Sequence, residues 1–321
     1  MTIDTLISPT PAAESPEPVD DPPALKPPLR VVVTENVCSV RHRGQVGRIW
    51  ASDCRAGVIR ARLDGGEWVS GPPSCFRPAP YRVCVITSCT ASKSVHSARR
   101  LTLADLRAAG PQLKRREKAL RRFSQPAEKM YSGAQHLRLM RGITAFRAAY
   151  SADRAGLDLY ILSAGYGLIP GSQRIVPYEA TFTEMSRNGR QCWGEQLGVP
   201  GVLRQVVRPS YDLGMVLLGA SYLDACGLDR CRYTGRSAPP VEFGGPTIVF
   251  CGESEERLPG DDRRVFRTII PETATRTFGC GQVGLKGELA ARVLERLAQD
   301  LTFASELHRG AGILGLLRTP A

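Results

Sequence analysis

Short apolar runs recur along the chain, and several end abruptly at small or hydroxyl-bearing residues. The clearest run is Leu157 to Leu162, which stops at Ser163-Ala164-Gly165. A nearly unbroken apolar run is typical of a strand covered on both faces in a mainly parallel sheet. Small residues at its end let a ligand approach the backbone, and open α/β sheets bind ligands at that edge. The pattern therefore predicts a central strand that leads into a binding site.

Strands and helices are predicted to alternate around this segment. Runs of the same kind predict strands at 82–87, 212–218, 247–250 and 266–270. Apolar residues at helical spacing predict helices at 101–123, 137–150, 199–207 and 285–301. The polar stretch after Phe182 has neither pattern, and we expect a lid or a DNA-facing loop there. This alternation indicates an α/β fold, a three-layer α/β/α sandwich with a mainly parallel central sheet.

The amino-terminal part has a different character. Short strand-like runs are separated by glycines and by the Asp64-Gly65-Gly66 turn, which predicts a small closed barrel that hides its strand edges. The residues before it are acidic and proline-rich, and we expect them to be disordered. The predicted divisions are a leader at 1–29, a barrel at 30–79, an α/β catalytic domain at 80–305 and a tail at 306–321.

The charge of the chain indicates its partner. The 321 residues include 43 Lys and Arg against 31 Asp and Glu, a net charge of +12. This excess favours a polyanion, with nucleic acid ahead of a membrane surface. No apolar run approaches the roughly 20 residues of a membrane helix, and the amino terminus does not resemble a signal peptide. We expect a cytoplasmic monomer that binds double-stranded DNA and no membrane.

Neither a metal nor a cofactor is expected. The ten cysteines include no C-x-x-C pair and have no histidine at ligand spacing, so we expect reduced thiols. The chain also lacks a P-loop, and no G-x-G-x-x-G follows the first predicted strand.

Basic residues cluster in the second half of the predicted helix 101–123 and just before it. Such a run is often a solvated face, but the overall charge makes phosphate contact an equal alternative. The candidate DNA-binding residues are Arg99, Arg100, Lys114, Arg115, Arg116, Arg121, Arg187 and Arg190. The barrel could hold phosphates through Arg41, Arg43, Arg48, Arg55, Arg60 and Arg62, or it could contact a protein.

Small, hydroxyl-bearing and aromatic residues mark the expected site. Amides and hydroxyls at a strand end suit an oxyanion or a base edge, and a lysine adds positive charge. The candidate substrate-binding residues are Ser88, Cys89, Thr90, Ser163, Ala164, Gly165, Tyr166, Gly167, Tyr178, Gly219, Tyr222 and Lys286. The candidate catalytic residues are Glu179 and Lys93.

Four motifs in this region carry a resemblance to known families. They are Cys89-Thr90-x-x-Lys93, Pro126-Ala127-x-x-x-Tyr131-x-Gly133, Ile161-Leu162-Ser163-Ala164-x-Tyr166-Gly167-Leu168 and Pro177-Tyr178-Glu179-x-Thr181. Together they resemble bacterial proteins of unknown function grouped with the YaaA peroxide-stress proteins. The first motif is also similar to the CS-x-x-K loop of archaeosine-synthase domains, which have a uracil-DNA-glycosylase-like fold. The familiar last motif has Asp where this chain has Glu179.

The overall layout resembles the Brig-type anti-phage DNA glycosylases, and the segment RGQVGRIWAS resembles KOW-type, SH3-like barrels of nucleic-acid-associated proteins. The resemblance implies a DNA-glycosylase-like fold. It also implies removal of a modified base, such as glucosylated hydroxymethylcytosine, from phage DNA to leave an abasic site.

The expected chemistry is consistent with these residues. Breaking a glycosidic bond builds positive charge on the sugar and negative charge on the base, so a carboxylate and a set of donors are needed. Glu179 suits the first role, although the sequence does not rank it above Glu128, Asp224 or Glu288. There are two alternative functions. One is a non-catalytic DNA-binding or DNA-protecting protein of the YaaA kind, and the other is a transferase acting on a tRNA base.

Overall fold

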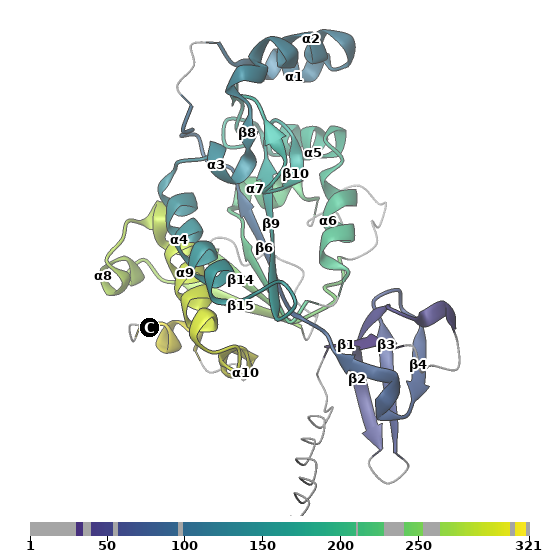
Figure 1. Ribbon diagram of the computed structural model, residues 1–321. Coiled ribbons are helices and arrows are strands. Elements are labelled where there is room, and N and C mark those ends of the chain that lie inside the picture. Colours follow the sequence, from purple (N-terminus) through teal and green to yellow (C-terminus); the bar gives the residue numbers. More distant parts are fainter. Residues whose placement is uncertain are drawn as a thin grey trace, which may run out of the picture.

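Two separate sheets organise the structure, which is a computed structural model (Figure 1). It describes residues 30–34, 40–53, 57–95, 99–209, 211–227, 241–252, 264–308 and 312–318. The predicted leader at 1–29 lies outside these residues.

The amino-terminal sheet is antiparallel, with strand order β4-β3-β2-β1-β5. Its elements are β1 (Arg30–Val33), η1 (Val40–His42), β2 (Val46–Asp53), β3 (Val58–Leu63), β4 (Trp68–Gly71), η2 (Pro73–Cys75) and β5 (Phe76–Pro78). Exposed and buried residues alternate along β3, because successive side chains of a strand point to opposite faces. The inner face forms a core of its own around Val31, Ile49 and Phe76. The short strands predicted at 30–79 are therefore confirmed.

The central sheet has strand order β10-β9-β6-β13-β14-β15. Its strands are β6 (Tyr81–Ser88), β9 (Ala155–Ser163), β10 (Gly167–Pro170), β13 (Leu213–Leu217), β14 (Thr247–Gly252) and β15 (Val265–Ile270). All strands except β10 run in the same direction, so the predicted mainly parallel sheet is confirmed. The antiparallel β10 was not expected. It forms because Gly167, with φ of 76°, turns the chain back along β9.

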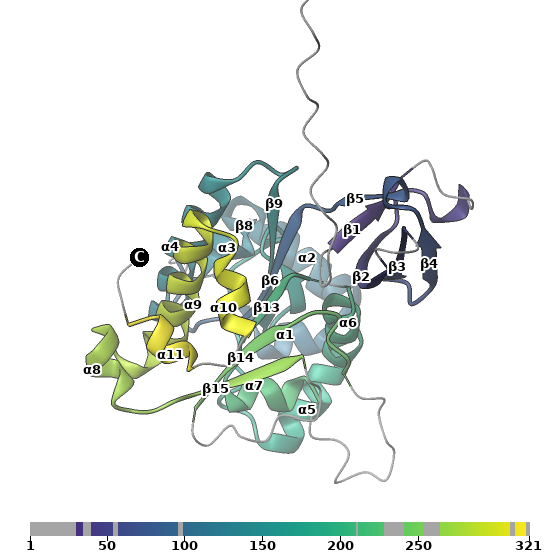
Figure 2. The same cartoon turned by 90° about the horizontal axis from the view of Figure 1, so that it is seen from below.

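Helices lie against both faces of this sheet (Figures 1 and 2). One face is covered by α4 (Ala134–Ala149) and α9 (Gln282–Gln299), and the other by α5 (Arg187–Gln196), α6 (Val199–Val207) and α7 (Ala220–Ala225). Glycines let α4 and α9 approach closely. A Cβ on Gly142 would lie 2.5 Å from the Cα of Ala291, and one on Gly287 would lie 2.1 Å from the carbonyl oxygen of Gln135. The two helices therefore pack closely over their amino-terminal halves.

The remaining elements are short. They are β7 (Leu101–Thr102), α1 (Leu103–Ala108), α2 (Gly110–Leu120), η3 (Arg121–Phe123), β8 (Gln125–Pro126), α3 (Ala127–Met130), β11 (Arg174–Ile175), β12 (Tyr178–Glu179), α8 (Ala274–Phe278), α10 (Phe303–His308) and α11 (Ile313–Leu316). None of the helices in the described part of the chain combines the length and hydropathy that a membrane span requires.

Two predictions about these segments were wrong. The helix expected at 101–123 is divided, because Thr102 caps α1 and Ala109, with φ of 49°, breaks the chain before α2. The irregular loop expected after Phe182 contains α5, whose amino end is capped by Ser186. The segment predicted as a tail, 306–321, includes α11 and the buried residues Leu307 and Leu317.

Buried charges fix the amino-terminal sheet to the central one. Asp212, immediately before β13, accepts a hydrogen bond of 2.8 Å from the backbone N–H of Arg82. Its carboxylate also pairs with Arg30 at 3.5 Å and with Arg48 at 3.7 Å. Arg48, expected to face phosphates, is thus part of this junction, and Arg55 lies outside the described residues. The junction is at the amino ends of β6 and β13, so the amino-terminal sheet lies opposite the carboxyl edge (Figure 1).

Candidate functional site

Three neighbouring parallel strands bring the predicted loops to one edge. In the sheet register Ser88 of β6 lies opposite Leu162 of β9, and Thr87 lies opposite Leu217 of β13. The N–H of Cys89 continues the pairing by donating to the carbonyl of Leu162 at 2.9 Å. The strand ends predicted to share an edge therefore do so, and the loops that follow them start side by side.

A buried hydrogen-bond chain supports this edge from below. The hydroxyl of Ser163 donates to Tyr178 Oη at 2.8 Å and accepts from the backbone N–H groups of Gly165 and Tyr166 at 3.2 and 3.1 Å. Tyr178 Oη is also 2.9 Å from Tyr131 Oη. A Cβ on Gly165 would lie 2.8 Å from the Tyr178 ring, so only glycine fits there. Tyr178, predicted to bind substrate, is buried, and together with the buried Tyr131 it supports the edge from below.

A second buried contact joins the loop after β6 to α7. The hydroxyl of Tyr222 donates to the carbonyl of Cys89 at 3.2 Å and lies 3.2 Å from its Sγ. The ring of Phe182 packs edge-to-face on Tyr222, with centroids 5.3 Å apart. Nearby, Trp193 Nε1 donates to the carbonyl of Ala164 at 2.8 Å. Cys89, Tyr222 and Ala164 thus hold the backbone of the edge in place.

Polar groups from α4 and α9 close the other side. Gln135 Nε2 donates to Thr87 Oγ1 and to the carbonyl of Leu217, both at 3.1 Å. Lys286 Nζ donates to the carbonyl of Leu218 at 2.8 Å. The amino ends of these two helices also place positive dipole ends at the edge. The sequence indicated Lys286 but not Gln135, because a glutamine in a first helical turn carries no pattern of its own.

Lys93, Arg100 and Glu179 form a charged group at this edge. Lys93 Nζ lies 4.4 Å from the centroid of the Tyr178 ring. Burial lowers the pKa of Lys93, while Cys89 and Glu179 act to raise it and Arg100 acts to lower it. Glu179 Oε2 is 2.7 Å from Arg100 Nε, and the Glu179 side chain is 65% exposed. The two predicted catalytic residues are therefore electrostatic neighbours, and the carboxylate is open to solvent.

The loop that carries Lys93 is held by its own hydrogen bonds. Thr90 Oγ1 accepts from the backbone N–H of Gly133 at 3.1 Å and donates to the carbonyl of Ser92 at 2.8 Å. Lys93 itself pairs with Tyr131 in an isolated antiparallel bridge. Ser88, Thr90 and Lys93 are each half-buried, so part of each side chain remains accessible at the edge.

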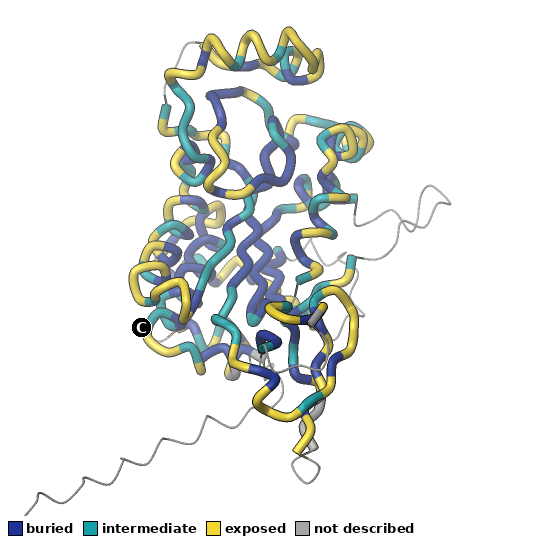
Figure 3. Tube along the Cα trace, turned by 45° about the vertical axis from the view of Figure 1, so that its right-hand side comes forward, coloured by how far each residue is buried: buried dark blue, intermediate teal, exposed yellow. Residues whose placement is uncertain are grey.

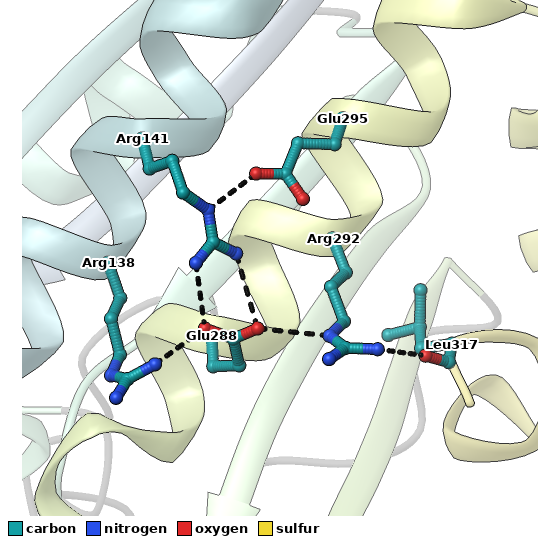
Figure 4. A network of polar contacts seen from close by, with 6 residues as sticks. All are labelled: Arg138, Arg141, Glu288, Arg292, Glu295 and Leu317. Carbon is teal, nitrogen blue, oxygen red and sulfur yellow. Dashed lines mark hydrogen bonds and ion pairs between the residues drawn. The ribbon is translucent and has the colours of Figure 1, made fainter. Parts of the chain in front are cut away.

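Glu288 is one of the acids that the sequence analysis kept as alternatives to Glu179, and its contacts are structural (Figure 4). It is buried between α4 and α9 and bonds to three guanidinium groups, those of Arg138 at 2.9 Å, Arg292 at 3.0 Å and Arg141 at 3.2 Å. Although burial acts to raise it, these bonds lower the pKa of Glu288 to about 2. Its oxygens are committed to holding the helices together.

The other two acids are also paired. Glu128 binds Arg147 at 2.9 Å. Asp224 binds Arg190 at 3.0 Å and Arg187 at 3.4 Å, which joins α7 to α5. Arg187 and Arg190, expected to contact DNA, therefore have a structural role. Among the acids that the sequence left open, Glu179 is the exposed one beside a lysine at the edge.

The other predicted DNA contacts lie near the edge, on α2 and the segments beside it. Arg99, Lys114, Arg115 and Arg121 are exposed, and Arg116 pairs with Asp105 at 3.2 Å. The pair α1 and α2 projects beyond the carboxyl ends of the strands, with much of its trace exposed (Figures 1 and 3). A basic surface of this kind can hold a phosphate backbone.

A pocket lies on the α6 side of the central sheet, away from this edge. In the described parts of the chain, His, Cys, Asp and Glu form no group that could hold a metal ion. The pocket is lined by Tyr211, Met215, Phe243 and Thr247, among others, and includes none of the predicted site residues.

A family model matches the central part of the chain. A model of a family of unknown function, DUF6884, matches residues 117–234. This range includes Ser163 to Gly167, Tyr178, Glu179 and Tyr222, but neither the loop from Ser88 to Lys93 nor the amino-terminal sheet. No curated protein matches the chain.

Proposed function

We propose that this protein is a DNA base glycosylase that removes a modified base from phage DNA and leaves an abasic site, as part of anti-phage defence. The observation that carries the proposal is the charged group at the carboxyl edge. There an exposed carboxylate, Glu179, lies beside a partly buried lysine, Lys93, whose loop also carries the half-buried residues Ser88 and Thr90. Cleavage of a glycosidic bond requires a negative charge near the sugar and a positive charge near the base, and Glu179 and Lys93 supply them respectively.

Glu179 is assigned to the sugar side of the reaction. As the bond from C1′ to the base nitrogen breaks, its carboxylate stabilises the positive charge that develops on the sugar. It also orients a water molecule, whose oxygen adds to C1′ and whose proton passes to the carboxylate. The Arg100 guanidinium, 2.7 Å away, pairs with the carboxylate and holds it at the edge.

Lys93 and its neighbours are assigned to the base side. The departing base carries the electron pair of the broken bond, and the Lys93 ammonium can stabilise that charge or return a proton to the base. Thr90, Ser88 and Gln135 supply further polar groups around the same position. The half-buried Tyr166 is the aromatic residue assigned to contact an extruded base, since Tyr178 is buried.

The architecture and the partner are part of the same proposal. We assign the central sheet and its helices to a three-layer α/β/α sandwich of the DNA-glycosylase kind, and the amino-terminal sheet to an SH3-like barrel. The exposed basic residues of α2 would hold double-stranded DNA while the base enters the edge. The protein is proposed to act as a monomer in the cytoplasm.

Base release by the full-length protein tests this function. The protein is incubated with genomic DNA from phages that carry different base modifications and with unmodified DNA, and the liberated bases are identified by mass spectrometry. We expect a free modified base and a matching number of abasic sites from at least one modified genome. Binding without any release across the panel would contradict the proposal and favour a non-catalytic DNA-binding protein.

A further inference from the structure

Two tryptophans are exposed side by side on the amino-terminal sheet. The exposed fractions of Trp50 and Trp68 are 61% and 49%, and their ring centroids lie 5.5 Å apart with planes at 84°. Trp193, the third tryptophan of the chain, is buried. Large aromatic surfaces left in water at two adjacent positions indicate a binding surface, because burying them inside the protein would be favourable.

The strands direct both rings to the outer face of the sheet. The pairing of β2 with β3 shifts between Ile49 and Ala51, so Trp50 occupies an irregularity of the kind that re-aims a side chain. Trp68 lies directly opposite Arg62 on β3. The alternate residues of β3, such as Ala61, face the core instead. The exposure of the rings therefore follows from the register.

The same face is basic. Arg60 and Arg62 are exposed and, like Trp68, lie on the outer side of β3 and β4. Glu67, the residue immediately before β4, is paired with Arg41 at 3.1 Å and with His42 at 3.3 Å. The outer positions of β3 and β4 carry no carboxylate. The surface thus combines aromatic rings with arginines, which complement bases and phosphates respectively.

We propose that Trp50, Trp68, Arg60 and Arg62 form a binding site for single-stranded nucleic acid. Bases stack on exposed rings only where they are unpaired, because a duplex keeps both faces of each base covered. The arginines bind the phosphates between the stacked bases. Stacking does not distinguish the bases, so the site is expected to bind without marked sequence preference.

This site is separate from the carboxyl edge. The amino-terminal sheet joins the central sheet at the amino ends of β6 and β13, through the contacts of Asp212 with Arg30 and Arg48. An eight-residue strand such as β6 spans roughly 25 Å. A strand bound at the tryptophans is therefore held away from Glu179. The inference does not depend on the proposed glycosylase activity, and each can fail without the other.

Tryptophan fluorescence of the full-length protein provides the test. Oligothymidine of roughly 12 nucleotides is titrated into the protein, since stacking quenches exposed tryptophans and leaves the buried Trp193 unaffected. We expect quenching in the wild type and affinity lowered about 10-fold or more by W50A or W68A. R62A should weaken binding and make it less dependent on salt. V283A, which truncates an exposed side chain on α9, is the matched control and should bind as the wild type does.

Circular dichroism establishes that each variant is folded. The variant W50F keeps an aromatic ring and should retain part of the affinity for oligothymidine. The proposal is overturned if oligothymidine does not bind, if W50A and W68A bind as tightly as the wild type, or if a duplex of equal length competes as well as the single strand. E179Q should bind oligothymidine normally, so a loss of base release would not be mistaken for a loss of this site.

Discussion

E179Q should reduce the rate of base release by about 10² to 10⁴-fold, the range expected for removal of a general base. The amide keeps the size of the side chain but can neither accept a proton from water nor balance positive charge on the sugar. The Glu179 side chain is 65% exposed, and so the substitution should leave the fold intact. Release is measured in single-turnover reactions, and binding of the same duplex is measured separately.

A nearby acid provides the control for this variant. Glu184 is exposed on the same stretch of chain, and E184Q removes the same charge from a position five residues away. Full activity in E184Q together with lost activity in E179Q would locate the effect at the carboxylate beside Lys93. If E179Q releases base at the wild-type rate, Glu179 has no role in the chemistry.

E288Q should lower the free energy of unfolding by about 3 kcal/mol at pH 7. This is the cost expected when a buried, paired carboxylate loses its charge. The substitution leaves Arg138, Arg141 and Arg292 around a neutral amide between α4 and α9. Urea denaturation measures the loss. The matched control is E295Q, because Glu295 pairs with Arg141 alone and its side chain is 24% exposed, so its loss should cost about 1 kcal/mol or less.

The pH dependence of E288Q checks the physical cause. The pKa of Glu288 is lowered to about 2 in the folded protein, below the ordinary value of 4.5. Its contribution to stability is therefore complete above pH 4.5 and decreases as the pH falls toward 2. The difference between the wild type and E288Q should narrow over that range. A difference that stays constant from pH 7 to pH 3 would show that packing, not charge, is responsible.

The central sheet could be predicted from local sequence because its inner strands β6, β13 and β14 bury most of their residues. Two apolar runs, from Leu157 to Leu162 and before Gly219, are typical of strands covered on both faces. By contrast, α5 is polar enough to resemble a loop, since Trp193 and Gly194 are its buried residues. Local pattern does not show that Ser186 caps it or that Asp224 holds it against α7.

The site was predicted in part for the same reason. Strand ends are local features, so the positions of Ser88, Ser163 and Gly219 at one edge follow from a parallel sheet. The partners of charged residues are not local. Arg190 binds Asp224 and Arg100 binds Glu179 across long stretches of chain, and no spacing rule predicts either pair. The sequence therefore offered Glu179 as a candidate but could not exclude Glu288, whose three arginines come from two helices.

Photocrosslinking tests most directly whether the base enters the carboxyl edge. A duplex carrying a halogenated pyrimidine at the modified position is irradiated with the full-length E179Q protein, and the crosslinked peptides are identified by mass spectrometry. The account predicts crosslinks to the segments that hold Ser88 to Lys93 and Ser163 to Gly167, with Tyr166 the foremost aromatic target. Crosslinks confined to the amino-terminal sheet or to the α6 side of the central sheet would contradict it.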